Sequence, residues 1–401
     1  MKRIVVVGAG QAGVALCAKL RALGFDGDLD VIGDETAPPY QRPPLSKDYL
    51  LGKMTGDRLS LRAPSFYNDN KIRLHLGQPV QNIDAKARKL TLGGRSLDYD
   101  ALALTTGSTA RRLPVQIGGS LKSVYTVRSL EDVDAMRTEF RAGAKLVVIG
   151  GGYIGLEAAA VAAKLGLNVT VVEMAPRILQ RVAAPQTSDY FRALHQKNGV
   201  KILEGIGLNH LLGDGRVRAA QLTDGRILDA DFVIVGVGIL PNISLAQDCG
   251  LVIDNGIATD LLGQTSDPSI WAAGDCASFD YRGQRLRLES VQNAIDQAEN
   301  TAANMLGAKK PYAPLPWFWS DQYDCKLQIA GLNTGYDNVI ARSTSDGAQS
   351  FWYFQGDQLL AVDAMNDPRA FMVAKRLLVG TIKISKTAVA DHNLDLKTLL
   401  N

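Results

Sequence analysis

A buried strand, a glycine-rich turn and a helical segment follow one another at the start of the chain. Residues 3–7 have the pattern of a buried strand, and after the turn the helical pattern runs to about Leu23. A second predicted strand at 29–32 is followed by Asp34 and Glu35. This order of strand, glycine turn, helix, strand and acid predicts a βαβ unit in a parallel sheet.

The same pattern recurs later in the chain. Residues 145–149 form a strand, 150–155 a glycine turn and 156–165 a helical segment, and a strand at 168–172 ends at Glu173. An internal repeat of this kind indicates two copies of one supersecondary unit. The sequence therefore predicts an α/β fold with two Rossmann-like dinucleotide-binding domains.

The last part of the chain has a different period. Apolar and polar residues alternate in 327–332, 338–343, 350–355 and 358–365, and a helical segment follows at 368–379. Alternation of this kind is typical of an antiparallel sheet with one covered face. We expect a C-terminal α+β domain with an antiparallel sheet and a covering helix.

Composition excludes several classes of protein. With 46% apolar and 21% charged residues the chain is of ordinary globular composition, and its formal charge of +3 comes without a basic stripe, so we expect no nucleic-acid binding. The apolar run at residues 4–7 is too short for a signal peptide, and no stretch approaches the roughly 18 apolar residues of a membrane span. We expect a cytoplasmic protein that is not embedded in a membrane.

Thiol and metal chemistry are not indicated. The four cysteines and four histidines are far apart in the sequence: Cys17, Cys249, Cys276, Cys325, His75, His195, His210 and His392. Their spacing gives neither a CxxC redox pair nor a metal-ligand cluster. We therefore expect no metal site and no catalytic histidine.

The two glycine turns predict phosphate binding. Their glycines are Gly8, Gly10 and Gly13 in the first unit and Gly150, Gly152 and Gly155 in the second. In each turn the first glycine permits a tight bend, the second lets the backbone approach a pyrophosphate, and the third lets helix and strand pack closely. The amino end of the following helix adds free N–H groups and a positive dipole. Together the two units predict two dinucleotide sites.

Acids after the second strand of each unit would bond a ribose. In the second unit this acid is Glu173, which would accept hydrogen bonds from the 2′-hydroxyl of NAD and repel the 2′-phosphate of NADP. Arg177, which lies nearby, is a residue type that can accommodate that phosphate. In the first unit the spacing is compatible with either Asp34 or Glu35.

Eight motifs spread over nearly the whole chain resemble those of a known group of flavoproteins. They occupy residues 8–13, 43–47, 105–107, 148–157, 236–242, 273–276, 289–291 and 317–323. With them the chain resembles the pyridine-nucleotide flavoprotein disulfide reductase superfamily, and within it the ferredoxin reductases that serve bacterial haem monooxygenases and aromatic-ring dioxygenases. Thr105 is a small departure, because the family usually has alanine there.

The resemblance implies that the first unit holds FAD and the second holds NAD, with the NAD domain inserted into the FAD domain. We expect the FAD-binding domain at residues 1–112 and 244–313, the NAD-binding domain at 113–243, and the C-terminal domain at 314–401. The implied FAD contacts are Gly8, Gly10, Ala12, Gly13, Asp34, Glu35, Lys47, Val80, Thr106, Gly107, Arg128, Gly274, Asp275, Glu289, Ser290, Val291 and Trp319. The implied NAD contacts are Gly150, Gly152, Tyr153, Ile154, Gly155, Glu157, Glu173, Arg177, Gly236 and Gly238.

On the resemblance, Asp34 is favoured over Glu35. It also implies that Asp275 bonds the ribityl or phosphate part of FAD, although a helix N-cap is the alternative. A core position is the alternative for Val80.

Lys47, Glu157 and Trp319 are the candidate catalytic residues. In relatives a lysine and a glutamate of these motifs pair beside flavin N5, where a positive charge would favour the reduced ring. The alternatives are a surface salt bridge for Lys47 and an exposed helix charge for Glu157. Trp319 is expected near the flavin, with core packing as its alternative.

The resemblance implies a reductase that takes a hydride from NADH onto FAD and passes electrons singly to a two-iron two-sulfur ferredoxin supplying an oxygenase. An NADH oxidase with a cysteine beside the flavin is less well supported, since residues 40–47 contain no cysteine. A signalling flavoprotein of the same superfamily is the other alternative. We expect a monomer whose C-terminal domain shapes the docking surface. Candidate steering charges are Arg285, Arg287, Lys309, Lys310 and Arg342.

Overall fold

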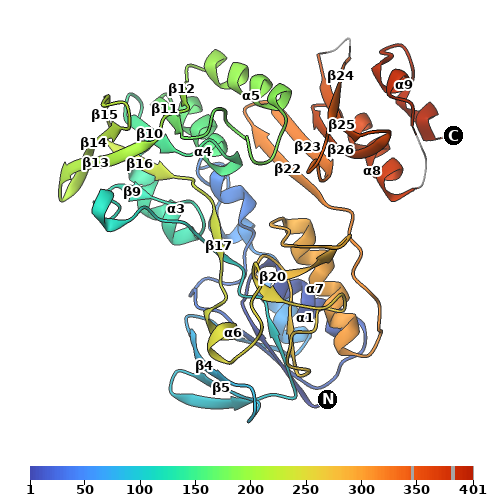
Figure 1. Ribbon diagram of the computed structural model, residues 1–401. Helices are drawn as coiled ribbons and strands as arrows, with labels where there is room; N and C mark the ends of the chain where they lie inside the picture. The colour runs from blue at the N-terminus through green and yellow to red at the C-terminus, as the bar shows by residue number, and fades with distance from the viewer. Residues whose placement is uncertain (345–346, 381–383, 401) are drawn as a thin grey trace. The chain divides into compact units, whose positions relative to one another are not determined.

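The computed structural model describes residues 1–344, 347–380 and 384–400 (Figure 1), so Asn401, the predicted end of the last domain, lies outside the described residues. The chain divides into two compact units. The first unit comprises Met1–Gln41, Thr55–Thr109 and Ile239–Pro316, and the second comprises Arg42–Met54, Ala110–Gly238 and Trp317–Asn401.

A five-stranded parallel sheet forms the centre of the first unit. Its strands in spatial order are β19 (Ile270–Ala272), β7 (Ala101–Leu104), β1 (Arg3–Val7), β2 (Asp28–Ile32) and β3 (Ile72–His75). Residues of β1, β2 and β7 are buried almost throughout, which explains the continuous apolar runs of β1 and β7, while β2 also buries the acid Asp30. Strand β19 comes from a late segment of the chain and pairs with β7, so distant parts of the sequence share one sheet.

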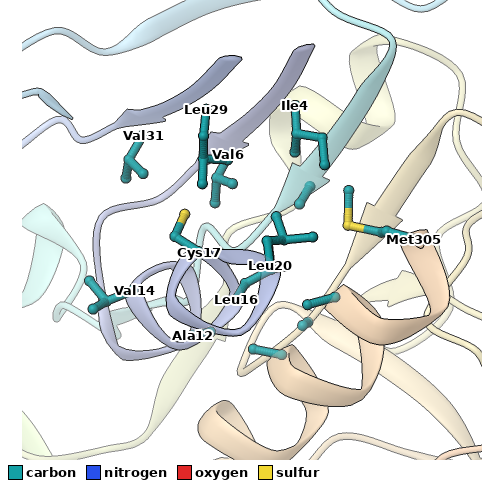
Figure 2. Packing of buried hydrophobic residues seen from close by; sticks show 14 of the residues in the cluster. Ile4, Val6, Ala12, Val14, Leu16, Cys17, Leu20, Leu29, Val31 and Met305 are labelled. Atoms are coloured by element: carbon teal, nitrogen blue, oxygen red, sulfur yellow. The ribbon is translucent and has the colours of Figure 1, made fainter. Parts of the chain in front are cut away.

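Helices α1 (Gln11–Ala22) and α7 (Val291–Met305) pack against each other and contribute to one core with strands β1 and β2. Figure 2 shows the side chain of Cys17 on α1 directed toward β2, the strand that carries Leu29 and Val31. The thiol is buried, and burial raises its pKa. Cys17 therefore acts as a small apolar core residue.

Smaller elements complete the first unit. They are the strands β4 (Val80–Asp84), β5 (Lys89–Leu92), β6 (Arg95–Asp98), β18 (Ile257–Ala258), β20 (Ala277–Tyr281) and β21 (Gln284–Leu286), and the helices α2 (Pro64–Asp69) and α6 (Ser244–Asp248). Strands β8 (Ser108–Ala110) and β17 (Ile239–Pro241) pair where the chain leaves this unit and returns to it.

A second five-stranded parallel sheet lies in the second unit. Its order is β12 (Lys201–Glu204), β11 (Asn168–Glu173), β10 (Lys145–Ile149), β16 (Phe232–Val235) and β9 (Val124–Tyr125). Strand β10 lies between β11 and β16 as β1 lies between β2 and β7. The repeat in the sequence is therefore a repeat of the structure.

Three helices and a three-stranded antiparallel sheet accompany this parallel sheet. They are α3 (Leu130–Met136), α4 (Tyr153–Lys164) and α5 (Pro185–Lys197), with β13 (Leu208–Asp214), β14 (Arg216–Leu222) and β15 (Ile227–Asp229). Helix α4 begins at Tyr153, three residues before the predicted start, because the glycine turn leads straight into it.

The C-terminal part of the second unit is an antiparallel sheet. Its order is β22 (Trp317–Gln322), β23 (Cys325–Gly331), β26 (Gln358–Met365), β25 (Gln349–Gln355) and β24 (Asn338–Ser343). Helix α8 (Pro368–Val379) shares a core with this sheet, and α9 (Lys386–Ala390) follows. The predicted fold class is confirmed, whereas the boundaries at residues 112, 243 and 313 stay predictions. None of the described helices has the length and apolar character needed to cross a membrane.

Candidate functional site

Two glycines of the first turn are required by the protein's own packing. Gly8 has a φ of +116°, in the region that favours glycine, and a Cβ there would lie 2.1 Å from the Thr105 carbonyl oxygen. A Cβ on Gly13 would lie 2.0 Å from the Gly8 carbonyl oxygen. These contacts bring the end of β7 against the turn and pack α1 closely on β1.

Packing within the protein does not require the middle glycine of either turn. Gly10 (φ −88°, ψ −162°) and Gly152 (φ −81°, ψ 176°) both have extended backbones that any residue can adopt. No protein atom lies within 4 Å of a Cβ built on Gly10, and for Gly152 the nearest atom is the Gly236 carbonyl oxygen at 4.0 Å. Each position leaves space at the amino end of a helix, where N–H groups and the dipole attract anions. The residues present therefore fit a dinucleotide pyrophosphate at both turns.

The second turn repeats the first in detail. Gly150 has a φ of +103°, and a Cβ there would lie 2.4 Å from the Gly236 carbonyl oxygen. A Cβ on Gly155 would lie 2.3 Å from the Gly150 carbonyl oxygen. Gly236, a predicted NAD contact, is thus placed beside the turn. Gly238 also has a φ of +103°, and a Cβ there would lie 3.8 Å from the Arg181 guanidinium.

The carboxylate of Glu173 lies at the edge of the second turn. It accepts hydrogen bonds from the backbone N–H groups of Gly151 (2.6 Å) and Ala175 (2.7 Å). Arg177 is directed to α5, where its guanidinium donates to the Ser188 hydroxyl at 2.6 Å. Glu173 is therefore held at the edge of the second turn, where its contact with a ribose stays a prediction, while Arg177 braces the loop that precedes α5.

Comparison of the two strand–turn–helix repeats explains why the acid of the first repeat comes at least one residue later than that of the second. The N–H of Gly8 donates to Ile32 and that of Gly150 to Val172, both at 2.8 Å, so Gly33 corresponds to Glu173. A Cβ on Gly33 would lie 2.8 Å from the Ala9 Cβ, which leaves no room for an acid there. Asp34 is the first acid after the strand.

The side chains of Asp34 and Glu35 differ in their surroundings. Asp34 is exposed. Glu35 is half-buried and accepts a hydrogen bond from the Tyr40 hydroxyl at 2.5 Å. These observations support the preference for Asp34 as the ribose-binding acid.

Segments far apart in the sequence meet at the first turn of α1. A Cβ on Gly274 would lie 3.0 Å from the Ala12 Cβ, and the Gly274 N–H donates to the Gln297 side chain of α7 at 2.9 Å. Asp275 accepts a hydrogen bond from the Ser108 hydroxyl at 2.8 Å. No helix of the described chain begins at Asp275, so the N-cap alternative is wrong. Ser108 and Gln297 escaped the sequence interpretation because their partners are remote.

A reciprocal pair of hydrogen bonds joins the end of β7 to the returning chain. The Thr106 hydroxyl donates to the Asn242 carbonyl oxygen (2.7 Å), and the Asn242 side-chain amide donates to the Thr106 carbonyl oxygen (2.8 Å). The Asn242 N–H also donates to the Gly107 carbonyl oxygen (2.9 Å). Asn242, from the motif at residues 236–242 that also holds the implied NAD contacts Gly236 and Gly238, thus holds Thr106 and Gly107 in place.

The remaining predicted FAD contacts of the first unit lie at a helix end and on a peripheral strand. Ser290 is the N-cap of α7, because its hydroxyl accepts a hydrogen bond from the Asn293 N–H, and Val291 is the first residue of that helix. Glu289 pairs with Arg287 at 2.7 Å. Val80 on β4 packs against the core, as its structural alternative predicts.

An ion pair lies in the second unit between Lys47 and Glu157. Lys47 directly follows a 3₁₀ turn at Pro43–Ser46, and its Nζ lies 2.7 Å from Glu157 Oε2 on α4. The Glu157 carboxylate also accepts hydrogen bonds from the hydroxyls of Ser46 and Ser320, each at 2.7 Å. Glu157 is 4% exposed and the Lys47 side chain 18% exposed. The alternatives of a surface salt bridge and an exposed helix charge are therefore wrong.

Three other predicted contact residues, Arg128, Tyr153 and Ile154, also belong to the second unit. Arg128 donates through its N–H to Asp132 (3.0 Å), and its carbonyl oxygen accepts from the Arg42 guanidinium (2.7 Å). The Tyr153 ring packs on Phe318, with centroids 4.9 Å apart, so this side chain contacts β22. Ile154 is exposed.

The two tryptophans of β22 have different neighbours. Their ring centroids lie 5.6 Å apart. Trp317 also packs on Phe371 of α8, and the Lys375 Nζ lies 4.9 Å from its ring, so Trp317 belongs to the C-terminal core. Trp319 is half-buried. Because Trp317 is packed into the C-terminal core, Trp319 is the better candidate of the two for contact with a cofactor.

Most of the candidate steering charges are not free. Arg342 is buried, and its guanidinium donates to backbone carbonyl oxygens that include that of Val389 at 3.0 Å. Arg285 lies 3.4 Å from Asp254, and Arg287 pairs with Glu289. The prediction is wrong for Arg342, whose position inside an alternating strand hid its burial. Lys309 and Lys310 are exposed.

Residues 2–298 match the pyridine nucleotide-disulphide oxidoreductase family, and residues 317–400 match the reductase C-terminal domain. The chain belongs to the pyridine nucleotide-disulphide oxidoreductase family. It is a flavoprotein oxidoreductase that uses FAD and NAD(H), in agreement with the two glycine turns.

Particular relatives resemble the chain over its whole length. Rhodocoxin reductase of Rhodococcus erythropolis is 41% identical over 399 residues, which cover 98% of this chain and 93% of that protein. Putidaredoxin reductase CamA of Pseudomonas putida is 42% identical over 406 residues, which cover 99% and 96%. The solved covalent complex of putidaredoxin reductase with putidaredoxin matches at a TM-score of 0.96 and 41% identity, covering 100% of this chain and 98% of that chain. The resemblance to ferredoxin reductases is confirmed.

Proposed function

We propose that this protein oxidises NADH and passes the electrons one at a time to a two-iron two-sulfur ferredoxin that supplies an oxygenase such as a haem monooxygenase. When bound, FAD supplies the chemistry that makes this possible, since it accepts a hydride as two electrons and releases electrons singly. The buried Lys47–Glu157 ion pair is the observation that carries the proposal, because it provides a fixed positive charge with which to favour a reduced ring.

The state of the cysteines supports single-electron transfer over a thiol relay. All four are free thiols, and Cys17, Cys276 and Cys325 are buried. Burial raises the pKa of each of the four thiols. Because the thiolate is the reactive form, a raised pKa makes each cysteine a poor electron-relay nucleophile.

Each part of the chain has a proposed role. In the first unit, the glycine turn and Asp34 hold the pyrophosphate and ribose of FAD, and Asp275 holds its ribityl or phosphate part. In the second unit, the corresponding turn and Glu173 hold NADH. On the resemblance, Lys47 and Glu157 act at flavin N5 and Trp319 covers the flavin region.

The names of the relatives support an iron-sulfur partner. Rhodocoxin reductase and putidaredoxin reductase are named for the proteins they reduce, and one solved structure contains putidaredoxin reductase joined to putidaredoxin. We further propose that this protein is a monomer and acts in the cytoplasm, where NADH is available. Gel filtration and cell fractionation test these two points.

The decisive experiment is NADH-driven cytochrome c reduction by the purified protein with and without a small two-iron two-sulfur ferredoxin from the same genome. A rate that rises and saturates with ferredoxin would establish the reductase function. If several such ferredoxins give no increase while NADH consumption follows loss of oxygen, an NADH oxidase would be the better assignment.

Glu173→Ala should lower kcat/KM for NADH more than for NADPH. The variant removes the acceptor for the ribose 2′-hydroxyl and the charge that repels a 2′-phosphate, so the ratio of the two kcat/KM values should fall by about tenfold or more. Steady-state kinetics with both coenzymes measure it. Arg177→Ala is the matched control on the same loop and should change the ratio little. An unchanged ratio in Glu173→Ala would refute the ribose assignment.

A further inference from the structure

A continuous chain of hydrogen bonds leads away from the Lys47–Glu157 pair. Ser320 donates to Glu157 Oε1 at 2.7 Å, and the Gln322 side-chain amide donates to the Ser320 hydroxyl at 3.2 Å. The other end of that amide lies 2.8 Å from His195 Nε2, and His195 Nδ1 lies 3.1 Å from the Tyr323 hydroxyl. Ser320, Gln322 and His195 are all completely buried.

The protonation state of His195 and the orientation of Gln322 fix the donor-to-acceptor direction of these hydrogen bonds. Burial lowers the pKa of His195 to about 4, so its ring is neutral at pH 7. Because the Gln322 amide nitrogen donates to Ser320, its oxygen is the atom that accepts from His195 Nε2–H. His195 Nδ1 is then the acceptor for the Tyr323 hydroxyl. Every donor points along the chain toward the Glu157 carboxylate, and bonds aligned in this way strengthen one another.

The alternation of strand β22 produces this arrangement. Side chains at every second position share a face of a strand, so Phe318, Ser320 and Gln322 lie on one face. On that face Phe318 contacts Tyr153 of α4, Ser320 contacts Glu157 of α4, and Gln322 contacts His195 of α5. A face buried against two helices is normally apolar, and its polar members need partners to offset their desolvation. Here the hydrogen bonds of these polar side chains form one chain that ends at the Glu157 carboxylate.

We propose that Ser320, Gln322 and His195 are positioning residues, which hold the Glu157 carboxylate against Lys47 and thereby set the reduction potential of the bound flavin and its rate of reduction by NADH. The inference rests on the proposed function, because that function assigns the ion pair to flavin N5. Ser46 holds the same carboxylate from the opposite side, through Oε2. The two serines together fix both carboxylate oxygens.

Ser320→Ala in the FAD-loaded enzyme tests the proposal. The variant leaves Glu157 Oε1 without its serine donor. The carboxylate then interacts more strongly with Lys47 and neutralises more of its positive charge. We expect the flavin midpoint potential to fall and the rate constant for flavin reduction by NADH to fall about tenfold, the loss typical of one hydrogen bond to a charged group. Ser320→Thr, which restores a hydroxyl, should recover most of both. Gln322→Met, one bond further away, should give a smaller change in the same direction.

Ser350→Ala is the matched control. Ser350 is also a completely buried serine of the C-terminal sheet, and its hydroxyl donates to Asp367 at 3.3 Å and accepts from the Trp352 indole at 3.1 Å. This variant should lower thermal stability but leave the potential unchanged. Equal changes in Ser320→Ala and Ser350→Ala would overturn the proposal, since they would show a general effect of loosening the sheet.

The variant Glu157→Gln separates failure of this inference from failure of the proposed function. If Ser320 acts through Glu157, adding Ser320→Ala to Glu157→Gln should change the potential and the rate no further. If Glu157→Gln shifts the potential and Ser320→Ala leaves it unchanged within error, the positioning role alone is refuted. If Glu157→Gln changes neither quantity, the assignment of the ion pair to the flavin falls, and the positioning role falls with it.

Discussion

Gly152→Val is expected to abolish flavin reduction by NADH while the protein keeps its fold and its FAD. The backbone at Gly152 is extended, and the nearest protein atom to a Cβ lies 4.0 Å away, so the chain itself has room for a Cβ there. A valine would instead occupy the space proposed for the NADH pyrophosphate. Displacement of a reacting group by about 1 Å costs about 100-fold in rate, and we expect at least this loss in kcat/KM for NADH.

Gly10→Val is the reciprocal variant of Gly152→Val. Gly10 has the same backbone conformation and no protein atom within 4 Å of a Cβ, but it lies in the first unit. This variant should be purified folded and colourless, because FAD has lost its pyrophosphate site. Flavin absorbance, circular dichroism and stopped-flow reduction by NADH distinguish the two variants. Loss of FAD from Gly152→Val, or yellow Gly10→Val with normal activity, would contradict the assignment of the two turns.

Lys47→Met is expected to lower the flavin midpoint potential and to slow flavin reduction by NADH by about 100-fold, the loss found when one fixed charged or hydrogen-bonding group is removed from a reaction centre. The lysine supplies positive charge that favours an electron-rich ring. Its removal also leaves the buried Glu157 with only its serine donors. Breaking a buried ion pair in this way costs about 3 kcal/mol of unfolding free energy.

The effect of Lys47→Met on the flavin has to be separated from its effect on folding. Lys47→Arg keeps the charge and should retain most of the potential, whereas Glu157→Gln removes the buried anion and should raise it. Potentiometric titration and thermal unfolding of each holoenzyme measure the two effects. A potential for Lys47→Met equal to that of the unchanged protein would remove Lys47 from the flavin.

The sequence predicted those features whose causes are local. Gly8 and Gly13 are spaced by the geometry of one turn and the first turn of a helix, so this spacing and the contact of Gly13 with Gly8 follow from residues close together in the chain, whereas the contact of Gly8 with Thr105 does not. The second copy at Gly150 and Gly155 has the same contacts, which confirms the internal repeat. Period-two alternation likewise located four of the five strands of the C-terminal sheet to within a few residues and missed β22 (Trp317–Gln322).

Recognition of whole motifs, and not period or composition, indicated the remote parts of the site. No local pattern relates Lys47 to Glu157, because more than a hundred positions separate them in the chain. Their pairing was expected only from the resemblance, and the structure confirms it as a buried contact. The cofactors were expected from the turns and the resemblance together.

Sequence by itself determined the fold class, the two glycine turns and the position of Glu173 at the end of its strand, since each depends on side chains whose spacing along one strand or helix sets their geometry. Tertiary structure alone decided which buried and partly buried polar groups meet: Asn242 with Thr106, Ser108 with Asp275, and Ser320 with Glu157. It also excluded an acid at Gly33, through Ala9, and buried Arg342. These outcomes depend on the packing of segments that are remote in sequence, because a buried hydrogen bond is specified by both of its partners and by the exclusion of water around them.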